Sequence, residues 1–202
     1  FVLTFGSGYM AHPKNTDITD RLYVIFEKNV YGAPPPDPAD NCNPATDTCV
    51  PLYTAIDNSD LLDLTDPTNG PANSETNAPH GFYKDTTENG EKFLRSPLTI
   101  AGKTVYTSYL PEGSAAVTTT CGVEYLGGGR LYAMDFVTGE NVLSKDHIDL
   151  KQPGIPPEVV ALFIPGADGN TRVEFYVGTE HVEDDGLPSG VEILRTYWRE
   201  NK

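Results

Sequence analysis

The hydrophobic pattern of the chain consists of short runs separated by turn residues. Residues Thr104–Leu110 alternate with a period of two, which is typical of a strand. Glycine-containing turns at Ala101–Lys103 and Val137–Glu140 flank this region. Four consecutive segments therefore predict one antiparallel sheet, and they are Leu94–Ile100, Thr104–Leu110, Arg130–Phe136 and Asn141–Leu143.

The rest of the chain repeats this arrangement. Further strands are expected at Val2–Phe5, Arg21–Glu27, Gly81–Asp85 (as an edge strand), His147–Leu150, Val159–Ile164, Arg172–Gly178 and Val191–Trp198, with a strand or a helical turn at Leu61–Leu64. Three units share the order aromatic-rich strand, loop, strand, which indicates radial repeats. The expected fold is all-β: a partial β-propeller of about three four-stranded antiparallel blades in a single domain, residues 1–202.

A long insertion interrupts the strands between residues 30 and 58. It contains a proline-rich segment that cannot join a sheet, because proline lacks the backbone N–H. Cys42 and Cys49 lie close together in this insertion and predict a local disulfide, with a pair of free thiols as the alternative. Cys121 is left without a partner in the sequence.

Composition narrows the function classes. The chain has 19 glycines and 17 prolines in 202 residues, which favours a loop-rich β protein over a helical one. Its net charge of −15 opposes binding to nucleic acid, which is itself anionic. No apolar run approaches the ~20 residues of a membrane-spanning helix. The chain opens on a strand without an initiator methionine, so we expect a piece of a longer polypeptide.

Motifs for catalysis were sought and not found. The sequence has no Cys-x-x-Cys-His, no His-Glu-x-x-His and no Gly-x-Ser-x-Gly. The four histidines lie in expected loops, where a solvated side chain is the simplest interpretation. We therefore expect no catalytic residues and a protein that is not an enzyme.

Several segments together resemble a known family. GEKFLRSPLTIAGKTVYTSYLP, then Cys121, then GGGRLYAMDFVTG resembles the C-terminal propeller of the PilC/PilY type IV pilus biogenesis factors, which is built of quinoprotein-like repeats. The opening GSGYMAHPKNTDITDRLYVIFE, the segments SDLLDLTD and GFYKD, and the ending TYWRE follow the order of that family. The resemblance covers most of the chain.

The resemblance implies a secreted, non-enzymatic protein at the bacterial cell surface that acts in pilus assembly and surface adhesion. Implied partners are minor pilins or other pilus components, the missing N-terminal part of the same protein, and a host or abiotic surface. Some members bind calcium through alternating Asp and Asn residues. This chain lacks such a run, so no cofactor is expected; the weak candidates for a metal are Asp57, Asp60, Asp184 and Asp185.

Two other functions remain open. LYAMDFVTGENVL also resembles the repeat of pyrroloquinoline-quinone dehydrogenases, but those enzymes need tryptophans between blades and this chain has a single tryptophan, Trp198. The other alternative is a structural or accessory subunit of an extracellular filament. Recognition is expected in loops, and the first to consider are Tyr9–Asp20, the insertion around the two cysteines, and Ser114–Tyr125.

Overall fold

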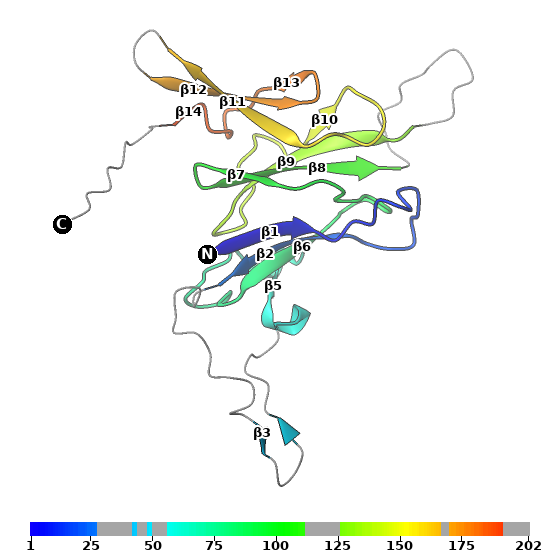
Figure 1. Ribbon diagram of the computed structural model, residues 1–202, viewed down its shortest axis with the longest axis vertical. Coiled ribbons are helices and arrows are strands. Elements are labelled where there is room, and N and C mark those ends of the chain that lie inside the picture. Colours follow the sequence, from blue (N-terminus) through cyan, green and yellow to red (C-terminus); the bar gives the residue numbers. More distant parts are fainter. Residues whose placement is uncertain (28–41, 44–47, 50–55, 112–125, 167–169, 192–202) are drawn as a thin grey trace, which may run out of the picture.

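The structure, a computed structural model, describes residues 1–27, 42–43, 48–49, 56–111, 126–166 and 170–191. These residues form strands and two single-turn 3-10 helices, so the fold is all-β as expected. Three sheets stack face to face, and none of them closes on itself (Figure 1). Within the described ranges no helix has the length and apolar character needed to cross a membrane.

The first sheet has the strand order β1-β2-β6-β5. Its strands are β1 (Val2–Gly6), β2 (Arg21–Phe26), β6 (Gly81–Asp85) and the short β5 (Leu62–Asp63). The first three pair antiparallel, and β5 runs parallel to β6. The prediction of an edge strand for Gly81–Asp85 is wrong, because β6 lies between β2 and β5. The second neighbour of β6 is β5, which comes from the segment that follows the long insertion.

The middle sheet is an antiparallel meander with the order β10-β9-β8-β7. Its strands are β7 (Leu98–Ile100), β8 (Lys103–Leu110), β9 (Gly128–Asp135) and β10 (Ile148–Leu150). The fourth strand is thus β10 and not the expected Asn141–Leu143, of which only Asn141 forms an isolated bridge to Met134. The β7–β8 turn has positive φ at Ala101 (47°) and Gly102 (77°), as a tight two-residue hairpin requires.

The last sheet is built around β12 (Thr171–Val177). On one side β12 pairs with β11 (Val159–Pro165), and it also pairs with β13 (Glu180–Val182) and with the short β14 (Gly190–Val191). The expected closing strand Val191–Trp198 lies outside the described residues beyond Val191.

The remaining elements lie between β2 and β6. Two 3-10 helices, Asn58–Asp60 and Pro67–Asn69, flank β5. A separate two-stranded ladder joins β3 (Cys42–Asn43) and β4 (Thr48–Cys49).

Two hydrophobic cores share the middle sheet. One core joins its Val105, Leu131 and Ala133 to residues of the last sheet such as Phe175. The other joins the opposite face to the first sheet, and its buried members are Leu22, Val24, Phe26, Ala72, Ala78, Phe82, Phe93, Tyr106 and Met134. Both faces of the middle sheet are therefore covered, whereas the described residues cover one face each of the first and last sheets.

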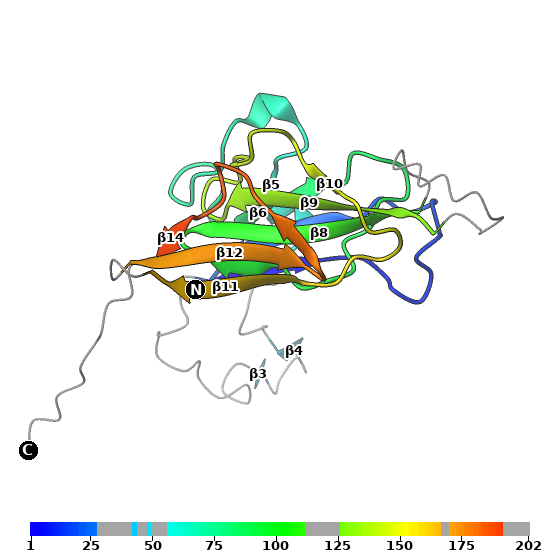
Figure 2. The same ribbon diagram turned by 90° about the horizontal axis from the view of Figure 1, so that it is seen from above.

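The stack has a consistent orientation. β1 and β11, the opening strands of the first and last sheets, lie along the same side of the stack (Figure 2). Both are edge strands of their sheets. The outer faces of the first and last sheets point away from each other, at opposite ends of the stack (Figure 1).

Candidate functional site

The loop between β1 and β2, residues 7–20, was expected to take part in recognition, and the structure places exposed apolar side chains on it. Tyr9 is 64% exposed, Met10 44% and Ile18 58%. Single exposed apolar side chains are common on protein surfaces, and several on one loop are a candidate contact surface. We call Tyr9, Met10 and Ile18 the apolar loop set.

This loop is held at both ends. The Gly8 amide donates to the Phe93 carbonyl at 3.1 Å, and the Ser7 hydroxyl lies 3.4 Å from a carboxylate oxygen of the buried Asp20. Burial raises the pKa of Asp20, while the nearby Lys92 opposes this shift. The loop is therefore anchored on the segment that leads into the middle sheet. This contact fixes the backbone that carries the exposed side chains.

A polar cluster lies near this anchor, where the segment before β7 meets β8 and β9 of the middle sheet. Glu91 is fully buried, and one of its carboxylate oxygens accepts hydrogen bonds from the hydroxyls of Ser108 and Tyr132, the latter at 2.7 Å. Burial, followed by the negative charge of Glu91, raises the pKa of Tyr132 well above its usual value. Both hydroxyls therefore keep their protons and act as hydrogen-bond donors.

Arg130 completes the cluster. Its side chain is 7% exposed, and its guanidinium nitrogens lie 3.5 Å from oxygens of Glu88, Glu91 and Asp149. None of these contacts has the geometry of a hydrogen bond for Nε or Nη1, which have no hydrogen-bond partner among the described residues. The three carboxylates balance the charge of Arg130 through ion pairs.

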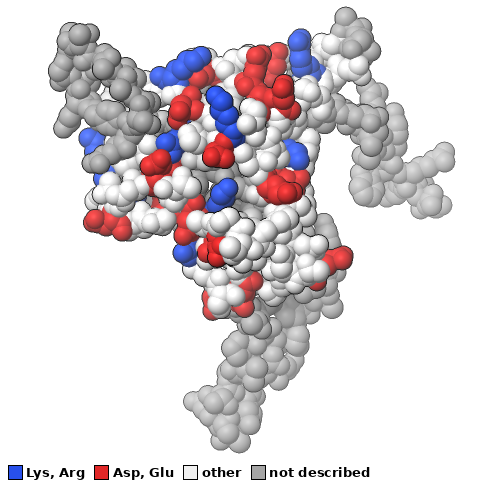
Figure 3. Space-filling view, turned by 180° about the vertical axis from the view of Figure 1, so that it is seen from behind, with Lys and Arg blue, Asp and Glu red and all other residues white. Residues whose placement is uncertain are grey.

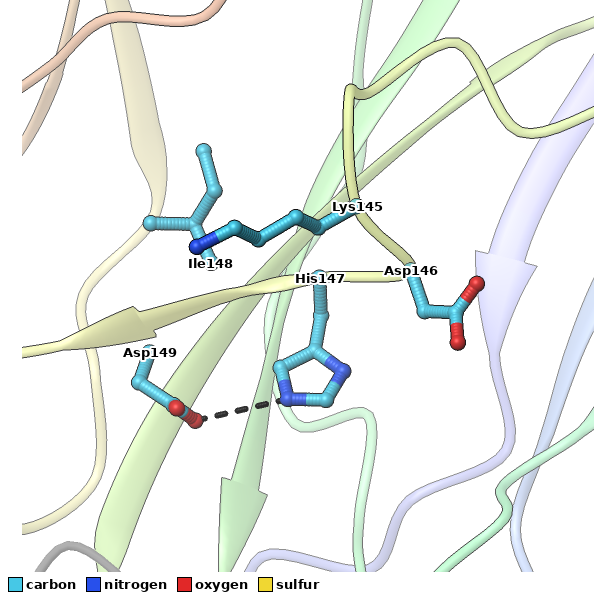
Figure 4. A pocket seen from close by; sticks show the side chains of 5 residues that line it. All are labelled: Lys145, Asp146, His147, Ile148 and Asp149. Atoms are coloured by element: carbon cyan, nitrogen blue, oxygen red, sulfur yellow. Dashed lines mark ion pairs between the residues drawn. The ribbon is translucent and has the colours of Figure 1, made fainter.

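A pocket of about 470 Å³ opens next to this cluster, at the segment that enters β10. Its lining residues are Lys145, Asp146, His147, Ile148 and Asp149. Figure 4 shows the His147 ring directed toward Asp149, with a distance of 3.5 Å between Nε2 and the carboxylate, while Asp146 points to the other side. The His147 ring also lies 5.6 Å from that of Tyr132.

The contacts of Ser108 and His147 favour binding over catalysis. The Ser108 hydroxyl has no exposed surface and donates to a carboxylate, so it is not placed as a nucleophile toward a substrate. His147 approaches Asp149 and not a hydroxyl or thiol. The arrangement ties the segment before β7 to β8 and β9 of the middle sheet.

The first two metal candidates form a helix cap. The Asp57 side chain accepts from the amide of Ser59 at 2.7 Å, and the Asp57 amide donates to the Asp60 carboxylate at 2.9 Å. This is a capping box on the 3-10 helix at Asn58–Asp60. The hydrogen bonds from Ser59 lower the pKa of Asp57.

The other two metal candidates lie in the loop after β13, on the rim of a pocket of about 280 Å³. Asp184 accepts from the amide of Ser144 at 3.0 Å, from its hydroxyl at 2.6 Å and from the amide of Gly186 at 2.9 Å. Burial opposes the effect, but these hydrogen bonds lower the pKa of Asp184. Asp185 is exposed beside it. The described part of the chain contains no group of three or more His, Cys, Asp or Glu side chains placed to hold a metal ion.

The cysteine prediction concerns β3 and β4. In their ladder Cys42 is directly opposite Cys49. Opposite residues of antiparallel strands have Cα atoms about 4.5–5.5 Å apart, a separation that a disulfide can span. The disulfide itself stays a prediction. Cys121 and the loop Ser114–Tyr125 lie outside the described residues.

Sequence reasoning did not identify Glu91, Arg130 or His147 as members of one site. The available signal was weak: Glu91-Lys92 directly precede a strand region, and Arg130 is a charged residue inside the strand GGRLYAMD, whose other charged residue, Asp135, stands at its end. A charged residue inside a buried strand needs a partner from elsewhere in the chain. The pairing with Glu91 depends on tertiary contact, which a pattern along one segment does not reveal.

Comparisons with known proteins give no relative for this chain. No protein-family model, no curated protein and no solved structure matches it.

Proposed function

We propose that this chain is part of a β-propeller in a secreted, pilus-associated protein that acts by binding and not by catalysis. The three stacked sheets would be three of its blades, and further blades would continue the ring beyond the first and last sheets. Support for this fold comes from the face-to-face stacking and from the meander of the middle sheet, in which each strand pairs with the next.

The assignment to the pilus rests on the resemblance to the PilC/PilY biogenesis factors. The segments that carry it fall on separate elements: RLYVIF forms β2, GFYKD forms β6, and KTVYTSYL and GGRLYAMD form β8 and β9. The protein would be located at the bacterial cell surface. Its partners would be minor pilins or other pilus components, the remainder of the same protein, and a host or abiotic surface.

The observation that carries the binding function is the apolar loop set. Tyr9, Met10 and Ile18 are exposed on a loop whose ends are anchored by Gly8 and Asp20. Exposed apolar side chains on a rigid scaffold bind a partner with a smaller loss of entropy than a loose loop does. No metal or quinone is needed for such a role.

The test is a binding measurement with purified pili. The parent chain is expected to sediment with pili, and the double substitution Tyr9→Ser with Ile18→Ser is expected to weaken this binding about tenfold or more, because anchors of this kind contribute about 1.4 kcal/mol or more. Val137→Ser is the matched control, since Val137 is 42% exposed in the turn after β9.

Immunogold labelling of cells provides the second readout. Labelling along or at the end of pili supports the assignment. A protein found away from pili and away from the outer surface, or equal binding by the parent and the loop variant, overturns it.

A further inference from the structure

The chain contains two methionines, and the structure gives them opposite surroundings. Met10 belongs to the apolar loop set and is 44% exposed, whereas Met134 on β9 is 2% exposed inside the core between the first and middle sheets. A thioether sulfur reacts with a small oxidant dissolved in water only where that oxidant can reach it. The two residues therefore differ in reactivity although their side chains are chemically the same.

The backbone holds Met10 at the surface. The Gly8 amide donates to the Phe93 carbonyl at 3.1 Å, and a Cβ on Gly8 would lie 2.2 Å from that carbonyl oxygen, so the chain is pressed against Phe93 two residues before Met10. The His12 amide then donates to the Tyr9 carbonyl at 3.3 Å, which closes a turn with Met10 at its first corner. A side chain at the corner of an anchored turn stays in contact with solvent.

Met10 also lies among the side chains that give the loop its apolar surface. Tyr9 directly precedes it, and the Tyr9 ring lies 5.6 Å from the His12 ring on the same turn. Ile18 follows later in this loop, which projects past the ends of β1 and β2 (Figure 1). A change in the polarity of Met10 therefore acts on the surface to which the binding function is assigned.

Oxidation by hydrogen peroxide makes a methionine side chain polar at the cost of one added atom. The thioether sulfur attacks the O–O bond; a S–O bond forms, the O–O bond breaks, and the sulfur gives up two electrons. One oxygen is transferred to the sulfur, and the other leaves as water with both protons. The sulfoxide oxygen accepts hydrogen bonds from water and must give them up in an apolar contact, which weakens that contact.

We propose that Met10 is a peroxide-sensitive modification site, and that its conversion to the sulfoxide weakens binding by the apolar loop set. The site itself rests on the exposure of Met10, and its effect on binding rests on the proposed function. The modification is reversible, because methionine sulfoxide reductases return the thioether. The loop would thus hold its partner under reducing conditions and release it under oxidising ones.

Peptide mass mapping tests the site without any partner. The folded chain is treated with hydrogen peroxide and sampled over time. Met10 is expected to gain one oxygen atom about tenfold or more faster than Met134, and the two rates should converge in urea, where the core no longer protects Met134. Equal rates in the folded chain overturn the proposal.

Binding to purified pili tests the consequence, with each protein compared with itself before and after peroxide. The parent is expected to lose about tenfold in affinity when Met10 is fully oxidised, and to regain it after treatment with the two sulfoxide reductases. Met134→Leu should respond as the parent does, whereas the affinity of Met10→Leu, whatever its starting value, should not change. An equal loss in Met10→Leu would assign the effect to other oxidisable side chains, such as cysteine, and overturn the proposal.

Retention on a hydrophobic-interaction column separates this proposal from the proposed function. The oxidised parent is expected to elute earlier than the untreated parent, while peroxide should leave the elution of Met10→Leu unchanged. A parent that binds pili equally before and after full oxidation of Met10 overturns the effect on binding and leaves the proposed function intact. A parent that does not bind pili before treatment overturns the proposed function and this effect together, while the mass map and the column still decide the modification site.

Discussion

Glu91 is a carboxylate with no exposed surface, and three side chains of the middle sheet surround it. Ser108 and Tyr132 donate hydrogen bonds to one oxygen, and Arg130 lies 3.5 Å from the other. Removing one member of a buried charge pair leaves the other uncompensated, which costs more than the pair contributes when intact. This cluster therefore holds the segment before β7 on the middle sheet through electrostatics as well as packing.

Glu91→Gln is expected to lower the free energy of unfolding by about 3 kcal/mol, because Arg130 loses its buried counter-charge. Urea denaturation followed by far-ultraviolet circular dichroism measures this change. Glu88→Gln is the matched control: the Glu88 side chain is 53% exposed and also lies 3.5 Å from Arg130, so its loss should cost less than about 1 kcal/mol. Equal effects of the two substitutions would contradict the role given to burial.

Asp135 gives a prediction for pH dependence. Burial opposes the effect, but hydrogen bonds from Lys103 at 2.9 Å and from the amides of Val137 and Thr138 lower the pKa of Asp135. Its folded pKa lies below the unfolded value near about 3.9, so its contribution to stability is full above that pH and is lost as the pH falls through the folded pKa.

Asp135→Asn should therefore destabilise the protein at neutral pH by no more than about 1 kcal/mol, since the side chain is partly exposed. The difference from the parent should shrink as the solution becomes more acidic than about pH 4. Thermal unfolding across this pH range measures it. A difference that grows on acidification would show that Asp135 acts in another way.

Turns position the elements against one another, and Gly139 is the clearest case. Its φ is 70°, and a Cβ there would lie 2.1 Å from Leu64 Cδ1 and 3.0 Å from Phe82 Cε2. The turn after β9 thus rests directly on the first sheet. The sequence predicted this turn from its composition, but not the contact, because the contact involves residues more than 50 positions away in the chain.

Gly139→Ala is expected to lower the free energy of unfolding by about 2–3 kcal/mol, from backbone strain and overlap together. Gly102→Ala is the control, because its φ of 77° is similar but the nearest atom to a Cβ is 4.0 Å away. It should cost only the strain, about 1 kcal/mol. Denaturation midpoints compare the two variants, and equal midpoints would rule out a steric contribution.

The β3–β4 ladder allows a direct test of the cysteine prediction. Peptide mapping of the unreduced protein should yield Cys42 linked to Cys49, because the ladder sets them opposite each other. Full alkylation of all three cysteines without reduction would exclude the disulfide.

At the scale of the whole molecule, much of the strand content could be predicted from local pattern. β2, β6, β8, β9 and β12 fall where period-two or apolar runs predicted strands. The pairing in the first sheet could not be predicted, since β5 and β6 come after the long insertion. The near-continuous burial of β8 was also missed, because alternation predicts one covered face whereas two neighbouring sheets cover both.

Charge at this scale is dispersed. On the face drawn in Figure 3 acidic and basic side chains are interspersed, although the chain as a whole carries −15. Such a surface favours solubility and gives no single strongly charged patch on that face. This is why contact with a partner is assigned to apolar side chains and not to charge alone.

Hydrogen exchange should follow the stacking. Amides of β8 and β9 are expected to exchange slowest, because they lie inside a sheet with both faces covered, and those of β1 and β11 faster, because these are edge strands. Mass spectrometry of the exchanged chain at low concentration measures this order. Equal protection of β8 and β11 would contradict it.

The middle sheet also has a consequence for synthesis on the ribosome. Its strands emerge after all of the first sheet but before any of the last one. Until residues 159–182 leave the ribosome, the side chains of Val105, Leu131 and Ala133 have no partner sheet and face the solvent. A pause in translation at that stage would leave this apolar face exposed on an incomplete chain. A chaperone would therefore protect the chain most during this interval.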